Sequence, residues 1–198
     1  MFKLALMKEL IRVPPERFGS PLEEVIEDIL RKGYMFNERQ EGGFEGRLHP
    51  DMGMILAIYK ITKIGEGKII PGDGAAYHRT EFEALIFYPE LHEIIDGEVV
   101  EVVEFGAFAR FAAFDALVHV SQITDDYISY DKKREALIGK ETRKVLEVND
   151  RVRARIVAVS LNPDKQKESK INLTMRQPGL GKFKWIEDEK KKAKNKEK

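Results

Sequence analysis

The chain has 198 residues, of which 42% are hydrophobic and 34% are charged, and its 34 basic residues balance 34 acidic ones. This length allows two modest domains. The absence of cysteine excludes disulfides and thiolate metal sites. No apolar run approaches the roughly 18 residues that span a bilayer, and no signal-peptide pattern opens the sequence. We therefore expect a cytoplasmic protein that does not enter a membrane.

The first predicted elements are a strand and a helix. Residues 2–13 (FKLALMKELIRV) have the content of a strand, which Pro14-Pro15 ends. Residues 20–23 (SPLE) have the pattern of a capping box, with Ser20 at the N-cap. Apolar residues at helical spacing follow, and the helix is expected to end near Gly33.

The next stretch predicts a loop and then two strands. Residues 34–46 are polar and contain glycines, so we expect a flexible loop there. Residues 52–64 and 82–89 have the apolar, β-branched content of strands. One helix on a small sheet makes an α+β unit, which we expect to cover residues 1–85.

Four glycines lie between these two strands, within residues 65–74. A P-loop would need glycine at Thr62 and serine or threonine at Ile69, and Pro71 blocks the helix that a dinucleotide fingerprint opens. The segment therefore predicts no nucleotide binding. A loop of unusual backbone conformation that docks on a partner fits better, because glycine adopts conformations forbidden to other residues. The candidate docking residues are Gly65, Gly67, Lys68, Pro71, Gly72, Asp73 and Gly74.

Residues 97–122 carry the strongest functional pattern. They begin as a strand with alternating inward and outward side chains over Val99–Val103, and Gly106 then lets the chain bend tightly. Four phenylalanines within ten residues stand beside two cationic side chains: Phe105, Phe108, Phe111, Phe114, Arg110 and His119. Exposed rings beside cations would form a stacking platform for single-stranded nucleic acid, whereas buried rings would form an ordinary core.

The motifs GEVVEVVEFGAF (97–108), LVHVSQI (117–123), DRVRARIVAV (150–159) and KINLT (170–174) resemble the S1 RNA-binding domain. This resemblance implies a five-stranded OB-type β-barrel, here over residues 86–178. In S1 domains two aromatic residues, a histidine and two late polar residues contact RNA. The matching positions hold Phe105, Phe108, His119, Ser160 and Lys170, where the family more often has aspartate and arginine at the last two.

Charge is unevenly distributed in this half of the chain. Residues 96–131 contain eight acidic residues and one basic residue, whereas residues 132–178 contain 13 basic and six acidic residues. Arginines on one predicted strand face, with one lysine, are candidates for a phosphate track beside the aromatic residues: Arg151, Arg153, Arg155 and Lys170. Alternatively, the two oppositely charged blocks neutralise each other in the fold.

Two further segments belong to the second half. Residues 125–144 interrupt the barrel pattern and predict an inserted hairpin. Residues 178–181 are expected to end the barrel, and residues 179–198 form a basic tail that is partly helical, with a short helix beginning at Phe183.

Three segments extend the resemblance over nearly the whole chain. GEGKIIPGDGAAYH (65–78), FEALIFYPE (82–90) and the insertion DDYISYDKKREALIGKET (125–142) are similar to the archaeal RNA polymerase stalk subunits called E-prime, the counterparts of the seventh subunit of eukaryotic RNA polymerase II. That family has a truncated RNP-like N-terminal domain, whose glycine-rich tip docks on core polymerase subunits, and an S1 domain that faces the emerging single-stranded transcript. Residues 34–46 depart from the family pattern because they contain an insertion.

The resemblance implies a non-catalytic polymerase subunit that forms a heterodimer with a smaller stalk partner, which we call the F subunit. Leu85, Phe87 and Tyr88 lie on a strand without a polar face, which predicts a surface that this partner covers. A free-standing S1 adaptor in translation or RNA decay is the alternative. The glycine-rich segment favours the stalk subunit, because such an adaptor has no use for it.

No catalytic centre is expected. The four histidines are scattered, without cysteine or helical pairing, so no zinc signature exists. Asp115, His119 and Ser121 form the only trio of hydrolase type, and no nucleophile elbow exposes the serine. The sequence therefore predicts neither a metal nor a cofactor.

Overall fold

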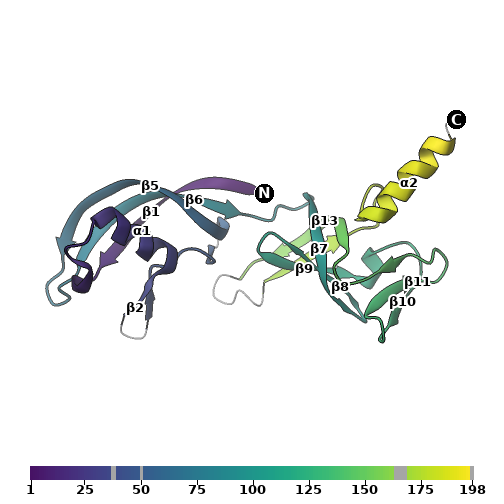
Figure 1. Cartoon of the computed structure of the whole chain (residues 1–198), viewed down its shortest axis with the longest axis horizontal. Helices are drawn as coiled ribbons and strands as arrows, with labels where there is room; N and C mark the ends of the chain where they lie inside the picture. The colour runs from purple at the N-terminus through teal and green to yellow at the C-terminus, as the bar shows by residue number, and fades with distance from the viewer. Residues whose placement is uncertain (37–38, 50, 163–168, 197–198) are drawn as a thin grey trace. The chain divides into compact units, whose positions relative to one another are not determined.

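The computed structural model describes residues 1–36, 39–49, 51–162 and 169–196, and divides into two compact units, Met1–Tyr88 and Pro89–Lys198. Each unit contains its own β-sheets and its own buried residues (Figure 1). No helix in the described ranges is long and apolar enough to cross a membrane.

The N-terminal unit is an antiparallel sheet with one helix on it. Its strands lie in the order β1 (Phe2–Val13), β6 (Ala76–Phe87), β5 (Gly53–Ile69) and β4 (Leu48–His49). A short 3₁₀ turn, Pro15–Arg17, follows β1, and helix α1 (Leu22–Lys32) then lies over one face of the sheet (Figure 1). The α+β fold predicted for this unit is confirmed. Strands β5 and β6 are longer at their connecting end than the predicted strands 52–64 and 82–89. Their ladder continues to the pair Ile69 and Ala76.

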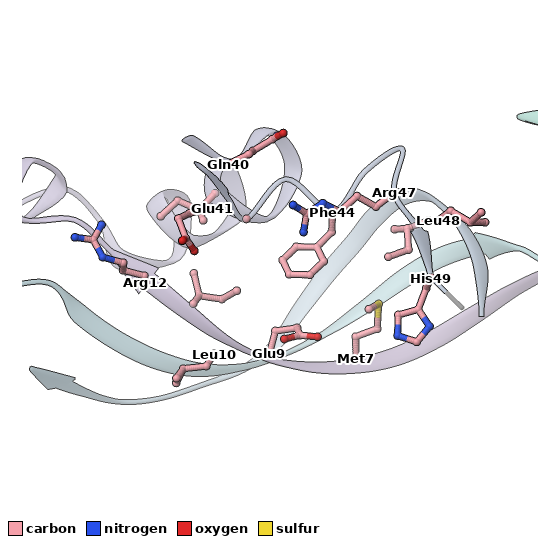
Figure 2. Close-up of a pocket in the computed structure, with 14 residues that line it drawn as sticks. Met7, Glu9, Leu10, Arg12, Gln40, Glu41, Phe44, Arg47, Leu48 and His49 are labelled. Carbon is pink, nitrogen blue, oxygen red and sulfur yellow. The ribbon is translucent and has the colours of Figure 1, made fainter. Parts of the chain in front are cut away.

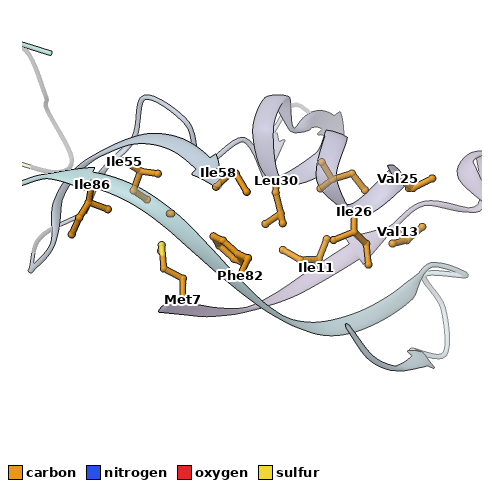
Figure 3. Close-up of a cluster of buried hydrophobic side chains, with 12 residues drawn as sticks. Met7, Ile11, Val13, Val25, Ile26, Leu30, Ile55, Ile58, Phe82 and Ile86 are labelled. Carbon is orange, nitrogen blue, oxygen red and sulfur yellow. The ribbon is translucent and has the colours of Figure 1, made fainter. Parts of the chain in front are cut away.

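Side chains from α1 and the sheet form one core, shown in Figure 3. The helix contributes four buried residues at helical spacing: Val25, Ile26, Ile29 and Leu30. They pack among Ile11, Ile55 and Phe82, all of which are almost completely buried. Alternation along the strands therefore places one row of side chains under the helix and the other row on the opposite face of the sheet.

The start of α1 differs from the predicted capping box. The helix begins at Leu22 with Pro21 as its N-cap, and no side chain caps it. The carbonyl of Pro21 accepts the first helical bond from the Val25 amide, at 3.1 Å. Pro21, predicted as the first helical residue, is therefore the N-cap, and the assignment of Ser20 as the cap is wrong.

The predicted flexible loop over residues 34–46 is also wrong. Strands β2 (Tyr34–Phe36) and β3 (Arg39–Glu41) pair as a hairpin. The chain then returns to the end of α1, where the amide of Gly43 donates to the carbonyl of Ile29 at 2.8 Å. Gly42 has no room for a side chain, since a Cβ would lie 2.5 Å from that same carbonyl. The hairpin and β1 border a hollow of about 410 Å³ (Figure 2).

The second unit is a closed five-stranded barrel, as the S1 resemblance implied. Its strands are β7 (Ile94–Val103), β8 (Gly106–Phe111), β9 (Phe114–His119), β13 (Arg151–Ser160) and β14 (Lys170–Thr174). Antiparallel pairs join neighbours in the order β9, β8, β7, β13 and β14, and a parallel pair between β14 and β9 closes the barrel. The predicted alternation at the start of β7 fails at a bulge between Val99 and Glu101, so Val99 and Val102 are both buried.

The insertion and the C-terminal segment complete this unit. The turn Val120–Gln122 leads into a separate sheet of β10 (Ile128–Asp131), β11 (Ala136–Gly139) and β12 (Val145–Leu146), which contains the predicted hairpin. The barrel does not end at residues 178–181 as expected, because β15 (Gly181–Lys182) pairs with β13. Helix α2 (Phe183–Lys196) is longer than the predicted short helix, and the last two residues of the predicted tail lie outside the described residues.

Candidate nucleic-acid interface and docking loop

The four phenylalanines of the barrel divide into two buried rings and two accessible rings. Phe111 and Phe114 point inward and are only 4% and 7% exposed. Phe105 is 52% exposed, and Phe108 on β8 is half-buried. The division follows from the strand period, because Ala107, Ala109 and Phe111 of β8 face the barrel interior and the residues between them face out. Core packing therefore accounts for only half of these rings.

The accessible rings lie beside His119. Gly106 pairs with His119 across β8 and β9, and a Cβ at Gly106 would lie 2.3 Å from the carbonyl of Val118. Glycine is therefore required where β8 meets β9, next to Phe105. The ring centroids of Phe105 and Phe108 are 6.3 Å apart in an edge-to-face arrangement. The structure thus brings together the three residues that the S1 resemblance selected.

Two further residues of this face were missed. Leu117 on β9 pairs with Phe108, and Asn172 on β14 pairs with Leu117, so the outer row continues onto the last strand. Leu117 is half-buried and Asn172 is exposed. Their sequence signal was present, since each lies two residues from a selected position, His119 or Lys170, on the same strand face. We call the surface formed by Phe105, Phe108, Leu117, His119 and Asn172 the aromatic face.

The predicted cations beside this face differ in how they are bound. Lys170 is exposed at the start of β14, opposite Ser160, and forms no ion pair with any described residue. Arg110 is also exposed, but its guanidinium donates to both carboxylate oxygens of Asp115, at 2.7 and 2.9 Å. Hydrogen bonding to Asp115 raises the pKa of Arg110. Arg110 is therefore already paired, whereas no residue in the described part of the chain pairs with Lys170.

The arginine stripe on β13 is largely engaged within the protein. Arg153 donates to both oxygens of Asp96, at 2.7 and 2.9 Å, and lowers the pKa of that carboxyl. The guanidinium carbons of Arg151 and Arg153 each lie 5.1 Å from the ring centroid of Phe183, at the start of α2. Arg155 is half-buried, and its Nε has no hydrogen-bond partner among the described residues. Arg151 and Arg153 therefore contact the C-terminal helix. The pair of Arg153 and Asp96 joins the basic block 132–178 to the acidic block 96–131, as the alternative of mutual neutralisation expected.

The glycine-rich segment is shorter as a loop than predicted. Gly65, Gly67 and Lys68 belong to β5, and only Ile70–Ala75 forms the turn to β6. A Cβ at Gly67 would lie 2.7 Å from the ring of His78, and one at Gly65 would lie 3.0 Å from the Arg79 carbonyl. The first two glycines therefore allow close packing at a bulge of the ladder rather than an unusual turn.

The second pair of glycines shapes the loop itself. Gly72 and Gly74 have φ angles of +95° and +72°, which side-chain-bearing residues rarely adopt. No atom lies within 4 Å of a Cβ placed at Gly72, and only Pro15 lies within 4 Å of one at Gly74. These glycines are required by backbone conformation and not by crowding. We call Ile70–Ala75 the tip loop.

Asp73 ties the tip loop to the strands. Its carboxylate accepts two bonds from Arg12, Nε at 2.8 Å and Nη2 at 2.6 Å, and a third from the hydroxyl of Tyr77. The Arg12 bonds, followed by the Tyr77 bond, lower the pKa of Asp73 to about 2. Arg12 was not predicted as a functional residue, although a lone arginine near the end of an apolar strand was a visible signal.

The residues predicted to form a partner surface are mostly covered within the chain. Phe87 is 3% exposed and packs edge-on against Phe2, with ring centroids 4.9 Å apart. Leu85 and Tyr88 are half-buried. β1 carries a row of large exposed apolar side chains, Phe2, Leu4, Leu6 and Leu10, each 56–60% exposed, and Tyr59 and Ile69 of β5 are exposed as well. Phe87 is covered because it pairs with Phe2 of β1, whose ring lies over it on the same face of the sheet.

The hydrolase-like trio is not assembled. His119 Nδ1 lies 2.9 Å from the hydroxyl of Ser121 and also accepts from its backbone amide, so this histidine caps the turn Val120–Gln122. Asp115 instead pairs with Arg110. Because no carboxylate of the described residues binds His119, the arrangement does not orient a general base.

Comparison with known proteins agrees with this architecture. The model of the S1 RNA binding domain matches residues 88–160, and the model of the SHS2 domain found in the N terminus of Rpb7p/Rpc25p/MJ0397 matches residues 43–74. These matches define the class as a two-domain protein with an N-terminal SHS2 domain of the Rpb7p type and a C-terminal S1 domain.

Relatives of full length identify the family within that class. DNA-directed RNA polymerase subunit Rpo7 of Sulfolobus acidocaldarius is 42% identical over 98% of this chain and 99% of its own length. Rpo7 of Saccharolobus solfataricus is 38% identical over 96% of this chain and all of its own length. DNA-directed RNA polymerase III subunit RPC8 of Saccharomyces cerevisiae is 28% identical over 86% of this chain and 79% of its own length.

The chain belongs to the Rpo7 family of DNA-directed RNA polymerase subunits. The predicted non-catalytic stalk subunit is confirmed, and the comparisons do not support the free-standing adaptor.

Proposed function

We propose that this subunit binds single-stranded RNA on the aromatic face of its barrel. The observation that carries the proposal is the division of the rings: Phe111 and Phe114 fill the core, while Phe105 and Phe108 remain accessible beside His119. Every base has a π-face, so stacking on these rings contributes about 1–3 kcal/mol per base with little dependence on sequence. Lys170 supplies a phosphate contact at the edge of the face.

The test compares a triple-alanine variant of Phe105, Phe108 and His119 with the wild-type chain in titrations against single-stranded RNA. Tyr127→Ala is the matched control, because that ring is 70% exposed but lies outside the aromatic face. We expect the triple variant to lose RNA affinity while the control keeps it. A thermal melt of each variant separates lost contacts from lost folding. Unchanged affinity in a folded triple variant would place the RNA site elsewhere.

We propose further that the tip loop docks on core polymerase subunits. Its positive-φ glycines, open surroundings and exposed Pro71 support a shape suited to insertion into a partner. Changing Gly72 and Gly74 to valine is expected to abolish incorporation into the polymerase and to leave RNA affinity unaltered. Gly19→Val is the control, since Gly19 also has a positive φ (+94°) and open space but lies outside the loop. Full incorporation of the double variant would contradict docking through the loop.

The apolar side chains of β1 support a third proposal, that the F subunit of the stalk covers this strand and forms a heterodimer with the chain. Phe2, Leu4 and Leu6 are exposed on a strand that pairs only with β6 within the described sheet. Burying a leucine contributes about 1.5–3 kcal/mol, so replacing Leu4 and Leu6 with serine should weaken association with this partner by about tenfold or more. Leu91→Ser is the control, as this equally exposed leucine lies in the other unit. Association of the double variant at wild-type strength would assign β1 another role.

Membership in this polymerase family supports a cytoplasmic location, together with the polymerase, for the subunit. A fluorescent fusion that fails to follow the polymerase during cell fractionation would contradict it.

A further inference from the structure

Arg12 is the most buried charged side chain of the described residues, at 6% exposure, and it lies near the end of β1, outside both the tip loop and the aromatic face. Burying a guanidinium is costly unless its donors are satisfied. In Figure 2, Arg12 and His49 lie at opposite ends of the hollow. Because Arg12 is buried, its charge does not serve to keep the surface soluble, and its hydrogen-bond partners indicate its role.

The donors of Arg12 connect three segments that are distant in the sequence. Nε and Nη2 hold the carboxylate of Asp73 in the tip loop, and Nη1 donates to the hydroxyl of Tyr34 at 2.9 Å. Tyr34 in turn donates to the backbone carbonyl of Arg12 at 3.1 Å. The two-point contact fixes the orientation of the Asp73 carboxylate as well as its distance.

The tip loop has few other restraints. Apart from the contacts of Asp73 and the buried Ala75, its residues are largely exposed, and Gly72 has open space around it. Asp73 supplies the only side-chain hydrogen bonds between this fully described loop and the strands. Loops with glycines at positive φ have many accessible conformations, and only the fraction in the docking shape can bind.

We propose that Arg12 is a positioning residue for docking, which holds the tip loop in its binding conformation through Asp73. This inference rests on the proposed docking function of the loop. Arg12 does not contact the polymerase itself. It raises the population of the binding-competent loop, and Tyr34 of the hairpin and Tyr77 of β6 complete the network.

The test uses the full chain with Arg12→Met, Arg12→Lys and Asp73→Asn. Methionine keeps much of the buried stem, lysine keeps the charge but cannot make the two-point contact, and asparagine keeps the shape of Asp73 without its charge. Arg79→Met is the control, because Arg79 is an exposed strand arginine in the same sheet. Two quantities are measured for each variant: capture of core polymerase, and amide hydrogen exchange within residues 70–75 against that of the core strands.

We expect the three variants to exchange faster in the tip loop, to keep wild-type exchange in the core strands, and to capture polymerase about tenfold more weakly. Combining Arg12→Met with Asp73→Asn should add little to either single change, because both remove the same interaction. Wild-type capture by a folded Asp73→Asn chain would overturn the inference. So would loss of core protection in that variant, because the ion pair would then support the whole domain and not the loop.

The glycine variant separates this inference from the docking proposal. If the Gly72 and Gly74 double variant still enters the polymerase, docking through the loop itself fails. If that variant is excluded while the Arg12 and Asp73 variants bind normally, docking stands and only the positioning role of Arg12 is wrong.

Discussion

The tip loop and the aromatic face hold their functional groups in opposite ways. In the loop, Asp73 is bound by Arg12 and Tyr77, and Gly72 and Gly74 set the backbone shape. On the barrel, Phe105 and His119 are exposed, and Lys170 has no ion-pair partner in the part of the chain that the structure describes. A loop that fits one fixed partner gains affinity from preorganisation, whereas a surface that accepts a changing RNA sequence needs accessible rings and charges.

The largest expected effect comes from removing the scaffold under the loop. Phe82 is fully buried where α1 meets the sheet, and Phe82→Ala should lower the free energy of unfolding of the N-terminal unit by about 3–5 kcal/mol. Each unit has its own core, so calorimetry should show one transition shifted, with polymerase incorporation reduced and RNA affinity kept. Ile156→Ala in the barrel is the reciprocal control. An RNA affinity that falls equally in Phe82→Ala would show that the two functions are not separable.

A single change on the aromatic face should have a smaller effect and should alter only RNA binding. Phe108→Ala removes one stacking ring and is expected to cost about 1–3 kcal/mol of binding free energy. The salt dependence of binding should not change, because no charge is lost. Fluorescence anisotropy across a salt series measures both quantities. A lower melting temperature with normal affinity would assign Phe108 to the core.

Lys170 and Arg153 of the barrel should respond differently to substitution. Lys170→Ala is expected to reduce the slope of log affinity against log salt by about 0.7, the value for one phosphate contact with a single strand. Arg153→Ala should leave that slope nearly unchanged, because Arg153 already binds Asp96 and lies over Phe183. Its exposed ion pair should contribute less than about 1 kcal/mol to stability. A flattened slope in the Arg153 variant would restore β13 to the RNA path.

The smallest effect concerns pH and distinguishes the bound loop from the open face. Folding lowers the pKa of Asp73 from 3.8 to about 2. The ionised carboxylate therefore stabilises the folded loop fully when the pH is above the pKa of the unfolded state. This contribution is lost as the pH falls from about 4 toward 2, when Asp73 becomes protonated. Hydrogen exchange in residues 70–75 should therefore rise at acidic pH in the wild-type chain and change less in Asp73→Asn. Equal pH responses in the two proteins would mean that another group controls the loop.

Local patterns predicted much of this protein. Strand alternation, helical spacing and two sets of motifs identified the α+β unit, the S1 barrel and the polymerase family. They also selected Phe105, Phe108 and His119, which the fold gathers on one face. These features depend on neighbouring residues in the sequence, and a period of two or of 3.6 is enough to assign a face.

Only the tertiary structure decided which charged and apolar groups are engaged. Arg12 and Asp73 are 61 positions apart, and Arg153 and Asp96 are 57 apart. Sequence patterns could therefore not show that Arg153 is paired while Lys170 forms no ion pair with a described residue. The loop predicted over residues 34–46 was wrong for the same reason, and the exposed leucines of β1 were not singled out, because the environment of both segments is set by elements from elsewhere in the chain. Periodicity gives the direction in which a side chain points, and the fold determines what it meets there.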